Sequence, residues 1–231
     1  MEKSVIKNLI QIAGIIDRAE AQMLVNAGVD WLGFPLRLPV HREDISEGEA
    51  AAIIHKLPPP HAGVLITYLD RALEVLALCR ALGTNIVQLH GAISPAETRK
   101  LHELDPDLLM IKSLIVRGDN FTALRERVER FSPYVDAFIT DTHDPDSGAD
   151  GATGKTHDWS ISRRLTELSP RPLILAGGLR PENVRDAIMT VRPAGVDAHT
   201  GVEGPGGRKS PEKIARFVAE AREAFAALEA E

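Results

Sequence analysis

RPLILAGGLRPENVRDAIMTVRPAGVDAHTG, residues 171–201, predicts one complete strand–helix–strand unit. The mostly apolar runs 171–178 and 195–201 predict two strands. The amphipathic segment 180–191 between them predicts a helix with Pro181 and Glu182 in its first turn. Two strands joined by a crossover helix lie parallel to one another. The stretch therefore indicates an α/β protein with a parallel sheet.

The same rhythm of a short apolar run followed by a longer amphipathic segment continues along the chain of 231 residues. The apolar runs are mostly continuous rather than alternating, which suits strands that are covered on both faces. Eight strands are predicted, at residues 9–16, 30–36, 62–69, 85–90, 108–116, 137–142, 171–178 and 195–201.

Helix signals separate these strands. Ser94, Pro95 and Glu97 predict a capping-box start, and Ser210 is expected to cap a long helix over residues 210–230. Eight strands, each followed by a helix, favour a closed (β/α)8 TIM barrel that forms a single domain over residues 1–231. An open doubly wound sheet uses the same rhythm and is the alternative. Both folds place the ligand site at the carboxyl ends of the strands.

Composition and charge narrow the possible partners. The net charge of −6 gives no basic footprint, so nucleic acid is not expected as a partner. The single cysteine, Cys79, excludes an intramolecular disulfide and fits a reducing, cytoplasmic compartment; its helical surroundings predict a buried structural thiol. No apolar run is long enough to span a membrane, and the N-terminus shows no signal-peptide pattern.

Glycines mark the ends of the seventh and eighth predicted strands. Gly177 and Gly178 follow one strand, and Thr200 and Gly201 end the other. Glycines let main-chain N–H groups approach an anion, and TIM barrels often bind phosphate at these two outlets. The alternative is that the glycines only permit tight turns. Because two such sites occur at the expected outlets, the pattern favours a phosphate site.

Polar residues near other strand ends are candidates for catalysis or binding. Asp141 ends the sixth strand, and Asp197 and His199 share one face of the eighth. A carboxyl group at the mouth could act as general acid or base, although a helix-capping or loop-bonding aspartate is the common alternative. Further polar residues are predicted to converge on the same mouth: Gln88, His90 and Lys112.

The long segment after the sixth strand is rich in glycine and aspartate, as mobile lids often are. It contains GATGKT, residues 151–156, which resembles part of a nucleotide-binding loop. That loop requires a glycine five residues before Gly154, where the chain has Ala149, so ATP and GTP are not expected. The histidines show no spacing with acids that would suggest a metal, and no cofactor is implied.

Together these motifs resemble the phosphoribosylanthranilate isomerase family of TIM barrels, from tryptophan biosynthesis. The matches are LGF (32–34), VQLHG (87–91), IK (111–112), GATGKTHDW (151–159), LAGGLRPENV (175–184) and TGVEGPGGRK (200–209). The resemblance implies an Amadori-type isomerisation of an aminoaldose phosphate. Asp141 matches the family's general acid, and Asp197 matches an aspartate that touches the substrate. Arg42 matches an arginine that faces the anthranilate carboxylate, and the glycine-rich outlets match the phosphate cradle.

The first strand departs from this family. The family has Lys-Ile-Cys-Gly, in which the cysteine is the general base, whereas this chain has Gln11, Ile12, Ala13 and Gly14. His199 also stands where a serine is common. An isomerase of this family would therefore need another base, for which the candidates are His199, His143 and Asp197.

Three functions remain open at this point. The first is a phosphoribosylanthranilate isomerase-like enzyme acting on N-(5'-phosphoribosyl)anthranilate or a related phosphosugar. The second is a non-catalytic phosphosugar-binding barrel. The third is a different phosphosugar reaction, such as one through a Schiff base on Lys112. In each case the expected partner is a small phosphosugar, and the protein is expected to be a monomer or a homodimer.

Overall fold

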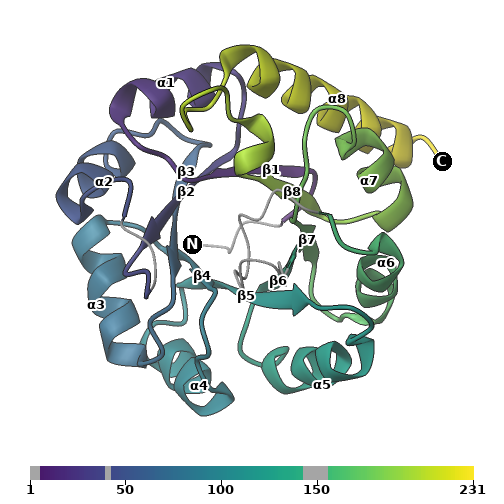
Figure 1. Cartoon of the computed structure of the whole chain (residues 1–231). Helices are drawn as coiled ribbons and strands as arrows, with labels where there is room; N and C mark the ends of the chain where they lie inside the picture. The colour runs from purple at the N-terminus through teal and green to yellow at the C-terminus, as the bar shows by residue number, and fades with distance from the viewer. Residues whose placement is uncertain (1–5, 40–42, 143–155) are drawn as a thin grey trace.

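The computed structural model describes residues 6–39, 43–142 and 156–231, and these form a closed barrel. The eight strands run parallel in the order β1 to β8, and β8 pairs with β1 to complete the ring, which the helices surround (Figure 1). The closure confirms the TIM barrel and excludes the open sheet. In the described part of the chain, no helix has the length and apolarity needed to cross a membrane.

All eight predicted strands are confirmed, most of them shortened at one or both ends. They are Leu9–Ala13 (β1), Trp31–Leu36 (β2), Ala62–Thr67 (β3), Ile86–Leu89 (β4), Leu109–Val116 (β5), Ala137–Thr142 (β6), Leu173–Leu175 (β7) and Gly195–Ala198 (β8). The helices are Arg18–Asn26 (α1), Glu47–Ile54 (α2), Ala72–Leu82 (α3), Pro95–Leu104 (α4), Phe121–Phe131 (α5), Trp159–Leu168 (α6), Val184–Val191 (α7) and Pro211–Glu229 (α8). A short 3-10 helix, Thr200–Val202 (η1), follows β8.

The core has two layers, because successive side chains of a strand point to opposite faces of the sheet. One buried cluster fills the barrel interior and includes Leu9, Ala13, Ile111, Ile139 and Ile174. A larger cluster lies between the strands and the surrounding helices. The position of a residue within its strand therefore decides whether it can reach the interior. Cys79 belongs to the outer layer, where burial raises the pKa of its thiol to about 12, as expected for a structural cysteine.

Two helix starts differ in detail from the sequence prediction. Ser94 and Ser210 cap α4 and α8 as expected. The capping box at α4 is wrong, however, because the Glu97 carboxylate accepts a hydrogen bond from Ala72 N at 2.7 Å and so supports the start of α3. Helix α7 begins at Val184 rather than near Pro181. The intervening segment forms a turn because Asn183 Oδ1 accepts from Arg180 N at 2.8 Å.

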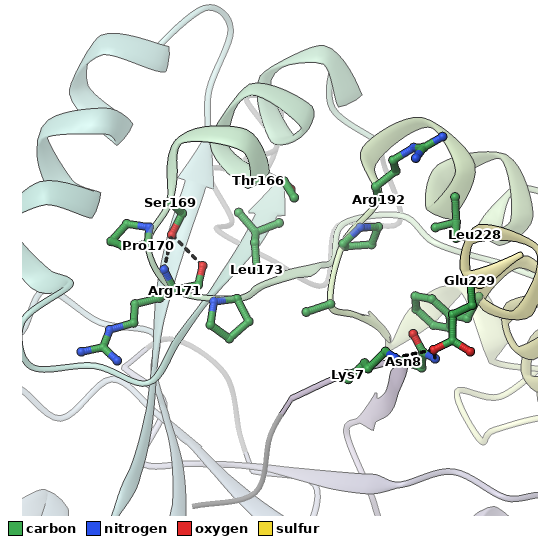
Figure 2. Close-up of a pocket in the computed structure, with 14 residues that line it drawn as sticks. Lys7, Asn8, Thr166, Ser169, Pro170, Arg171, Leu173, Arg192, Leu228 and Glu229 are labelled. Carbon is green, nitrogen blue, oxygen red and sulfur yellow. Dashed lines mark hydrogen bonds and ion pairs between the residues drawn. The ribbon is translucent and has the colours of Figure 1, made fainter. Parts of the chain in front are cut away.

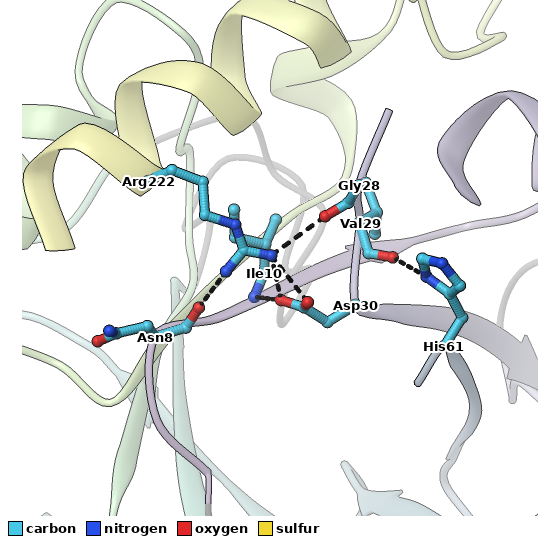
Figure 3. A network of polar contacts seen from close by, with 7 residues as sticks. All are labelled: Asn8, Ile10, Gly28, Val29, Asp30, His61 and Arg222. Carbon is cyan, nitrogen blue, oxygen red and sulfur yellow. Dashed lines mark hydrogen bonds and ion pairs between the residues drawn. The ribbon is translucent and has the colours of Figure 1, made fainter. Parts of the chain in front are cut away.

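An arginine network joins the last helix to the first two strands at the N-terminal face of the barrel (Figure 3). Arg222 donates to Asn8 O at 2.7 Å, to Gly28 O at 3.1 Å and to the Asp30 carboxylate at 2.7 and 2.8 Å. Asp30 Oδ2 also accepts from Ile10 N at 2.7 Å. Because α8 packs outside the junction of β8 and β1, this network fastens the point where the ring closes.

Candidate active site

Two carboxylates face the interior at the mouth of the barrel. Asp141 follows Ala137 and Ile139 on the inner face of β6, and Asp197 lies opposite Gln11 in the pairing of β8 with β1. Burial raises the pKa of the Asp197 carboxyl to about 7, and the negative charge of Asp141 contributes to this rise. The two groups therefore act on each other electrostatically across the mouth.

The surroundings of the two carboxyl groups differ. Asp141 is half-buried, and its Oδ1 accepts a hydrogen bond from Thr142 N at 2.8 Å. Asp197 is buried, and its Oδ1 has no hydrogen-bond partner in the described part of the chain. Such a pair can hold one proton between two unlike carboxyl groups, which is an arrangement suited to acid–base chemistry.

The glycine-rich outlets of β7 and β8 lie against each other. A Cβ atom added to Gly201 would lie 1.9 Å from the Leu179 carbonyl oxygen, so the two outlets touch through their backbones. Gly177 and Gly178 adopt left-handed φ angles of 99° and 64°, which glycine accommodates without strain.

The main-chain amides at these outlets are available to a ligand. No hydrogen bond joins the amides of Gly177, Gly178, Thr200 or Gly201 to an acceptor among the described residues. Amides without an acceptor next to the short helix η1 can bind an anion. The structure thus brings together the four residues of the expected phosphate cradle.

A chain of polar side chains crosses the interior below the mouth. Gln11 Nε2 donates to Gln88 Oε1 at 3.1 Å, and Gln88 Nε2 lies 3.5 Å from Ser113 Oγ. The same Ser113 hydroxyl lies 3.0 Å from His90 Nδ1. Gln88 and His90 are thus inside the barrel as expected. Ser113 was missed by the sequence reasoning, although it lies two residues from Ile111 on the inner face.

His199 lies above the end of β1 and is poorly suited to accept a proton. A Cβ atom on Gly14 would come within 2.1 Å of His199 Nε2, so the ring packs directly on this glycine. His199 Nε2 also lies 3.4 Å from Glu203 Oε1. Burial and the charge of Lys209 lower the pKa of the imidazole to about 3, although 24% of the side chain remains exposed. The ring is therefore neutral at pH 7.

The prediction that Lys112 joins the mouth is wrong. Its neighbours Met110 and Leu114 belong to the outer core layer, and Lys112 shares their face of β5. Its Nζ donates to Leu89 O at 2.7 Å and to Gly91 O at 2.8 Å, beneath the end of β4. Burial lowers the pKa of this amine to about 7. Since its amine is enclosed on the outer face of the sheet, Lys112 is not placed to form a Schiff base with a ligand in the mouth.

His157 ties the end of β6 to the start of α6, another feature that the sequence reasoning missed. Its Nδ1 lies 2.9 Å from Thr142 Oγ1 and its Nε2 lies 2.6 Å from Ser162 Oγ. Burial lowers the pKa of this imidazole to about 4, so the ring is neutral between the two hydroxyl groups. A cavity of about 540 Å³ opens here; its lining includes Val116, Asp119, Thr142, Thr156, His157 and Arg164.

A second cavity, of about 420 Å³, lies at the opposite, N-terminal face of the barrel (Figure 2). Two of the cations that line it are already paired: Lys7 contacts Glu229 at 2.7 Å, and Arg192 contacts Glu231. It is distant from the carboxyl ends of the strands, where the paired carboxylates and free amides lie. We therefore assign the candidate active site to the C-terminal mouth.

The position of the expected base is occupied by an apolar group. Ala13 belongs to the inner core cluster, and its Cβ lies close to the backbone of Gly33. Arg42 and His143, the other candidates from the sequence, lie outside the described residues. Within the described ranges, no group of three or more His, Cys, Asp or Glu side chains is arranged to hold a metal ion.

Comparison with known proteins agrees with this geometry. Residues 10–220 match the family described as N-(5'phosphoribosyl)anthranilate (PRA) isomerase. N-(5'-phosphoribosyl)anthranilate isomerase 2 of Methanosarcina mazei is 37% identical over 217 residues, which cover 94% of this chain and 95% of the relative. The crystal structure of phosphoribosyl anthranilate isomerase from Thermotoga maritima has a TM-score of 0.79 at 32% identity, covering 93% of this chain and 98% of that one.

Another solved structure is that of a phosphoribosyl anthranilate isomerase in complex with reduced 1-(o-carboxyphenylamino)-1-deoxyribulose 5-phosphate. It has a TM-score of 0.77 at 30% identity, covering 93% of this chain and 98% of that chain. The family match, the sequence relatives and the closed barrel with its glycine-rich outlets agree. This chain belongs to the N-(5'-phosphoribosyl)anthranilate isomerase family.

Proposed function

We propose that this protein isomerises N-(5'-phosphoribosyl)anthranilate to 1-(o-carboxyphenylamino)-1-deoxyribulose 5-phosphate. One observation carries the proposal: two interacting carboxylates and a cradle of free amides occupy the same end of the barrel in a member of this family. The cradle can hold the phosphate while the carboxylates act on the ribose. A related enzyme has been solved with a reduced form of this product.

The reaction needs one proton donor and one proton acceptor. A general acid protonates the ring oxygen and opens the ribose to an imine, and a general base removes the proton from C2 to give an enolamine. The enolamine then tautomerises to the ketone, so protons balance overall. Asp141 and Asp197, sharing one proton, supply both groups.

Asp197 replaces the missing general base, because it lies on the same side of the mouth as Ala13. It lies directly opposite Gln11 in the pairing of β8 with β1, and Gln11 precedes Ala13 by two residues on the same face. In the reactive state the shared proton lies on Asp141, which keeps the acid role that the family resemblance implies, and Asp197 is ionised and able to accept the C2 proton. His199 is the weaker candidate because its imidazole has little affinity for a proton, and we assign it instead to packing over Gly14.

Other residues at the mouth bind the parts of the substrate that do not react. Gly177, Gly178, Thr200 and Gly201 hold the phosphate through their amides. The family resemblance assigns Arg42, which lies outside the described residues, to the anthranilate carboxylate. Gln88 and His90 form the polar floor beneath the sugar. The subunit arrangement is a monomer or a homodimer; a Thermotoga maritima relative is described as dimeric.

The direct test is turnover of freshly prepared N-(5'-phosphoribosyl)anthranilate, followed by loss of anthranilate fluorescence. We expect saturable turnover that is inhibited by inorganic phosphate. Absence of turnover together with retained phosphate binding would support the non-catalytic barrel, for which the alanine at position 13 is the main argument. Restored growth of a tryptophan auxotroph expressing this protein tests the same reaction in cells.

Restoring the family's cysteine at position 13 should add little to this enzyme. Ala13 is buried among apolar side chains, and the neighbouring strand position holds the neutral Gln11, so a thiol there would have a raised pKa and remain protonated. We expect kcat/KM of Ala13→Cys to stay within about threefold of the parent at pH 7. A gain of more than about tenfold would show that the barrel lacks a base and that Asp197 does not fill this role.

A further inference from the structure

Two buried oxygen acceptors without donors lie on directly paired residues. Gln11 Oε1 and Asp197 Oδ1 are both enclosed and have no hydrogen-bond partner among the described residues. The two residues face each other in the register of β1 and β8. Buried acceptors in native proteins normally have donors, so this pair requires an explanation. The Gln11 side chain hydrogen-bonds the Asp197 carboxylate, but Asp197 Oδ1 stays without a donor within the described ranges. A proton on Asp197 would remove the negative charge that this enclosed, unpaired oxygen otherwise shares.

The orientation of the Gln11 amide is fixed from its other side. Its Nε2 donates to Gln88 Oε1, and Gln88 in turn lies against the Ser113 hydroxyl, which His90 also contacts. This chain of contacts links β1 with β4 and β5 across the interior. The side chain of Gln11 is thus held in place beneath the mouth rather than free to rotate.

An amide suits a carboxyl group that changes its protonation state. Its N–H₂ group can donate to the carboxylate without adding a charge, so the carboxyl group can still hold a proton. A lysine at the same position could only donate and would carry a positive charge, which favours the ionised carboxylate. A methionine could do neither.

Two charged groups and one neutral side chain act on Asp197 from three directions. Asp141 on β6 opposes its ionisation, whereas Lys209, after η1, favours ionisation weakly and is itself paired with Glu203 at 2.8 Å. From β1 the contact is the neutral Gln11. Burial is the largest influence, and the pKa of Asp197 is raised to about 7 in spite of Lys209 and the Gln11 amide.

We propose that Gln11 is a positioning residue: its amide orients Asp197 and, because it is uncharged, leaves one proton on the Asp197–Asp141 pair at neutral pH. This inference rests on the proposed isomerase function, which requires one protonated and one ionised carboxyl group. It assigns Gln11 a role through Asp197, without contact with the reacting atoms.

The test compares the pH dependence of kcat/KM in Gln11→Lys and Gln11→Met. In the parent enzyme, activity should fall on the alkaline side near pH 7, where the pair loses its last proton. The cation in Gln11→Lys lowers the pKa of Asp197, so this alkaline limb should move down by about one pH unit or more. Gln11→Met removes the stabilising amide, so the limb should move up.

A purely structural role for Gln11 would not move the alkaline limb of kcat/KM in opposite directions in the two variants. If both variants lose activity without any shift of the limb, Gln11 serves only packing and the proposal is overturned. Gln22→Lys is the matched control, because Gln22 is exposed on α1, outside the barrel interior; its pH profile should equal that of the parent. Thermal unfolding of each variant checks that the barrel is folded.

A measurement without substrate separates this proposal from the proposed function. Carboxyl ¹³C NMR of the ligand-free protein should show an aspartate that titrates near pH 7 and moves to lower pH in Gln11→Lys. If this titration responds as expected but no isomerase turnover exists, the proposed function fails while the link between Gln11 and Asp197 stands. If the titration ignores the substitution, the link itself is wrong.

Discussion

Replacing Asp141 or Asp197 by asparagine should lower kcat by about 10²- to 10⁴-fold and leave the barrel folded. Asparagine has the same shape but neither gives nor accepts a proton at these steps. An amide oxygen at position 141 can still accept from Thr142 N, so the local hydrogen bond survives. The loss should therefore appear in kcat, with little change in the KM for the phosphorylated substrate. The measurement is the fluorescence assay on both variants.

The double variant distinguishes a shared proton from two independent groups. If Asp141 and Asp197 act as one pair, removing either disables both steps, and removing both should cost little more than removing one. If the two groups act independently, the fold-losses in kcat of the two single variants should instead multiply in the double variant. A single variant that retains kcat within about threefold of the parent would remove that residue from the chemistry.

Asp197→Asn should also change how stability depends on pH. The folded protein holds the proton of Asp197 up to a pKa of about 7, whereas the unfolded chain releases it near the ordinary aspartate pKa of 3.8. The parent therefore gains stability from this proton at low pH and loses it as pH rises toward and through 7. The variant lacks this titration, so its unfolding free energy relative to that of the parent should rise between about pH 4 and pH 7 and level off above pH 7. Chemical denaturation at several pH values measures this difference.

The sequence predicted the barrel well because each strand and helix is specified locally. Apolar runs predict all eight strands, and the paired glycines predict the tight outlet of β7, where Gly177 and Gly178 adopt left-handed φ angles. Errors at element ends came from side chains of distant segments. Glu97 caps its neighbour α3 instead of completing its own capping box, which depends on how α3 and α4 pack.

The sequence does not show which residues of a strand point into the barrel interior and which point toward the helices. In a strand that is buried on both sides, the hydrophobic pattern does not distinguish the barrel interior from the helix layer. The sequence pattern therefore predicts Lys112 in the mouth, although Ser113 is the residue that points inward there. Likewise, the contact of Gln11 with Gln88 joins residues 77 positions apart, and only closure of the ring brings them together. Pairing register, rather than composition, decides these positions.

The second large effect is expected from Gly201→Ala, which should lower kcat/KM by about 100-fold. A methyl group at this position would meet the Leu179 carbonyl oxygen at 1.9 Å, far inside van der Waals contact. Neither side of this clash is a flexible side chain, so the outlets of β7 and β8 must move apart. A displacement on the order of 1 Å would separate the amides of Gly177 and Gly178 from those of Thr200 and Gly201.

The loss should appear chiefly in phosphate recognition. Asp141 lies in β6 and Asp197 lies within β8, before the outlet that contains Gly201. We therefore expect a raised KM and weakened inhibition by inorganic phosphate, with kcat less affected. Gly204→Ala is the matched control in the same loop, since an added Cβ there would have its nearest neighbours at 3.7 and 3.8 Å. It should bind phosphate like the parent. Equal phosphate binding in both variants would mean that the two outlets do not form the cradle, and the phosphate would then have to bind elsewhere in the mouth.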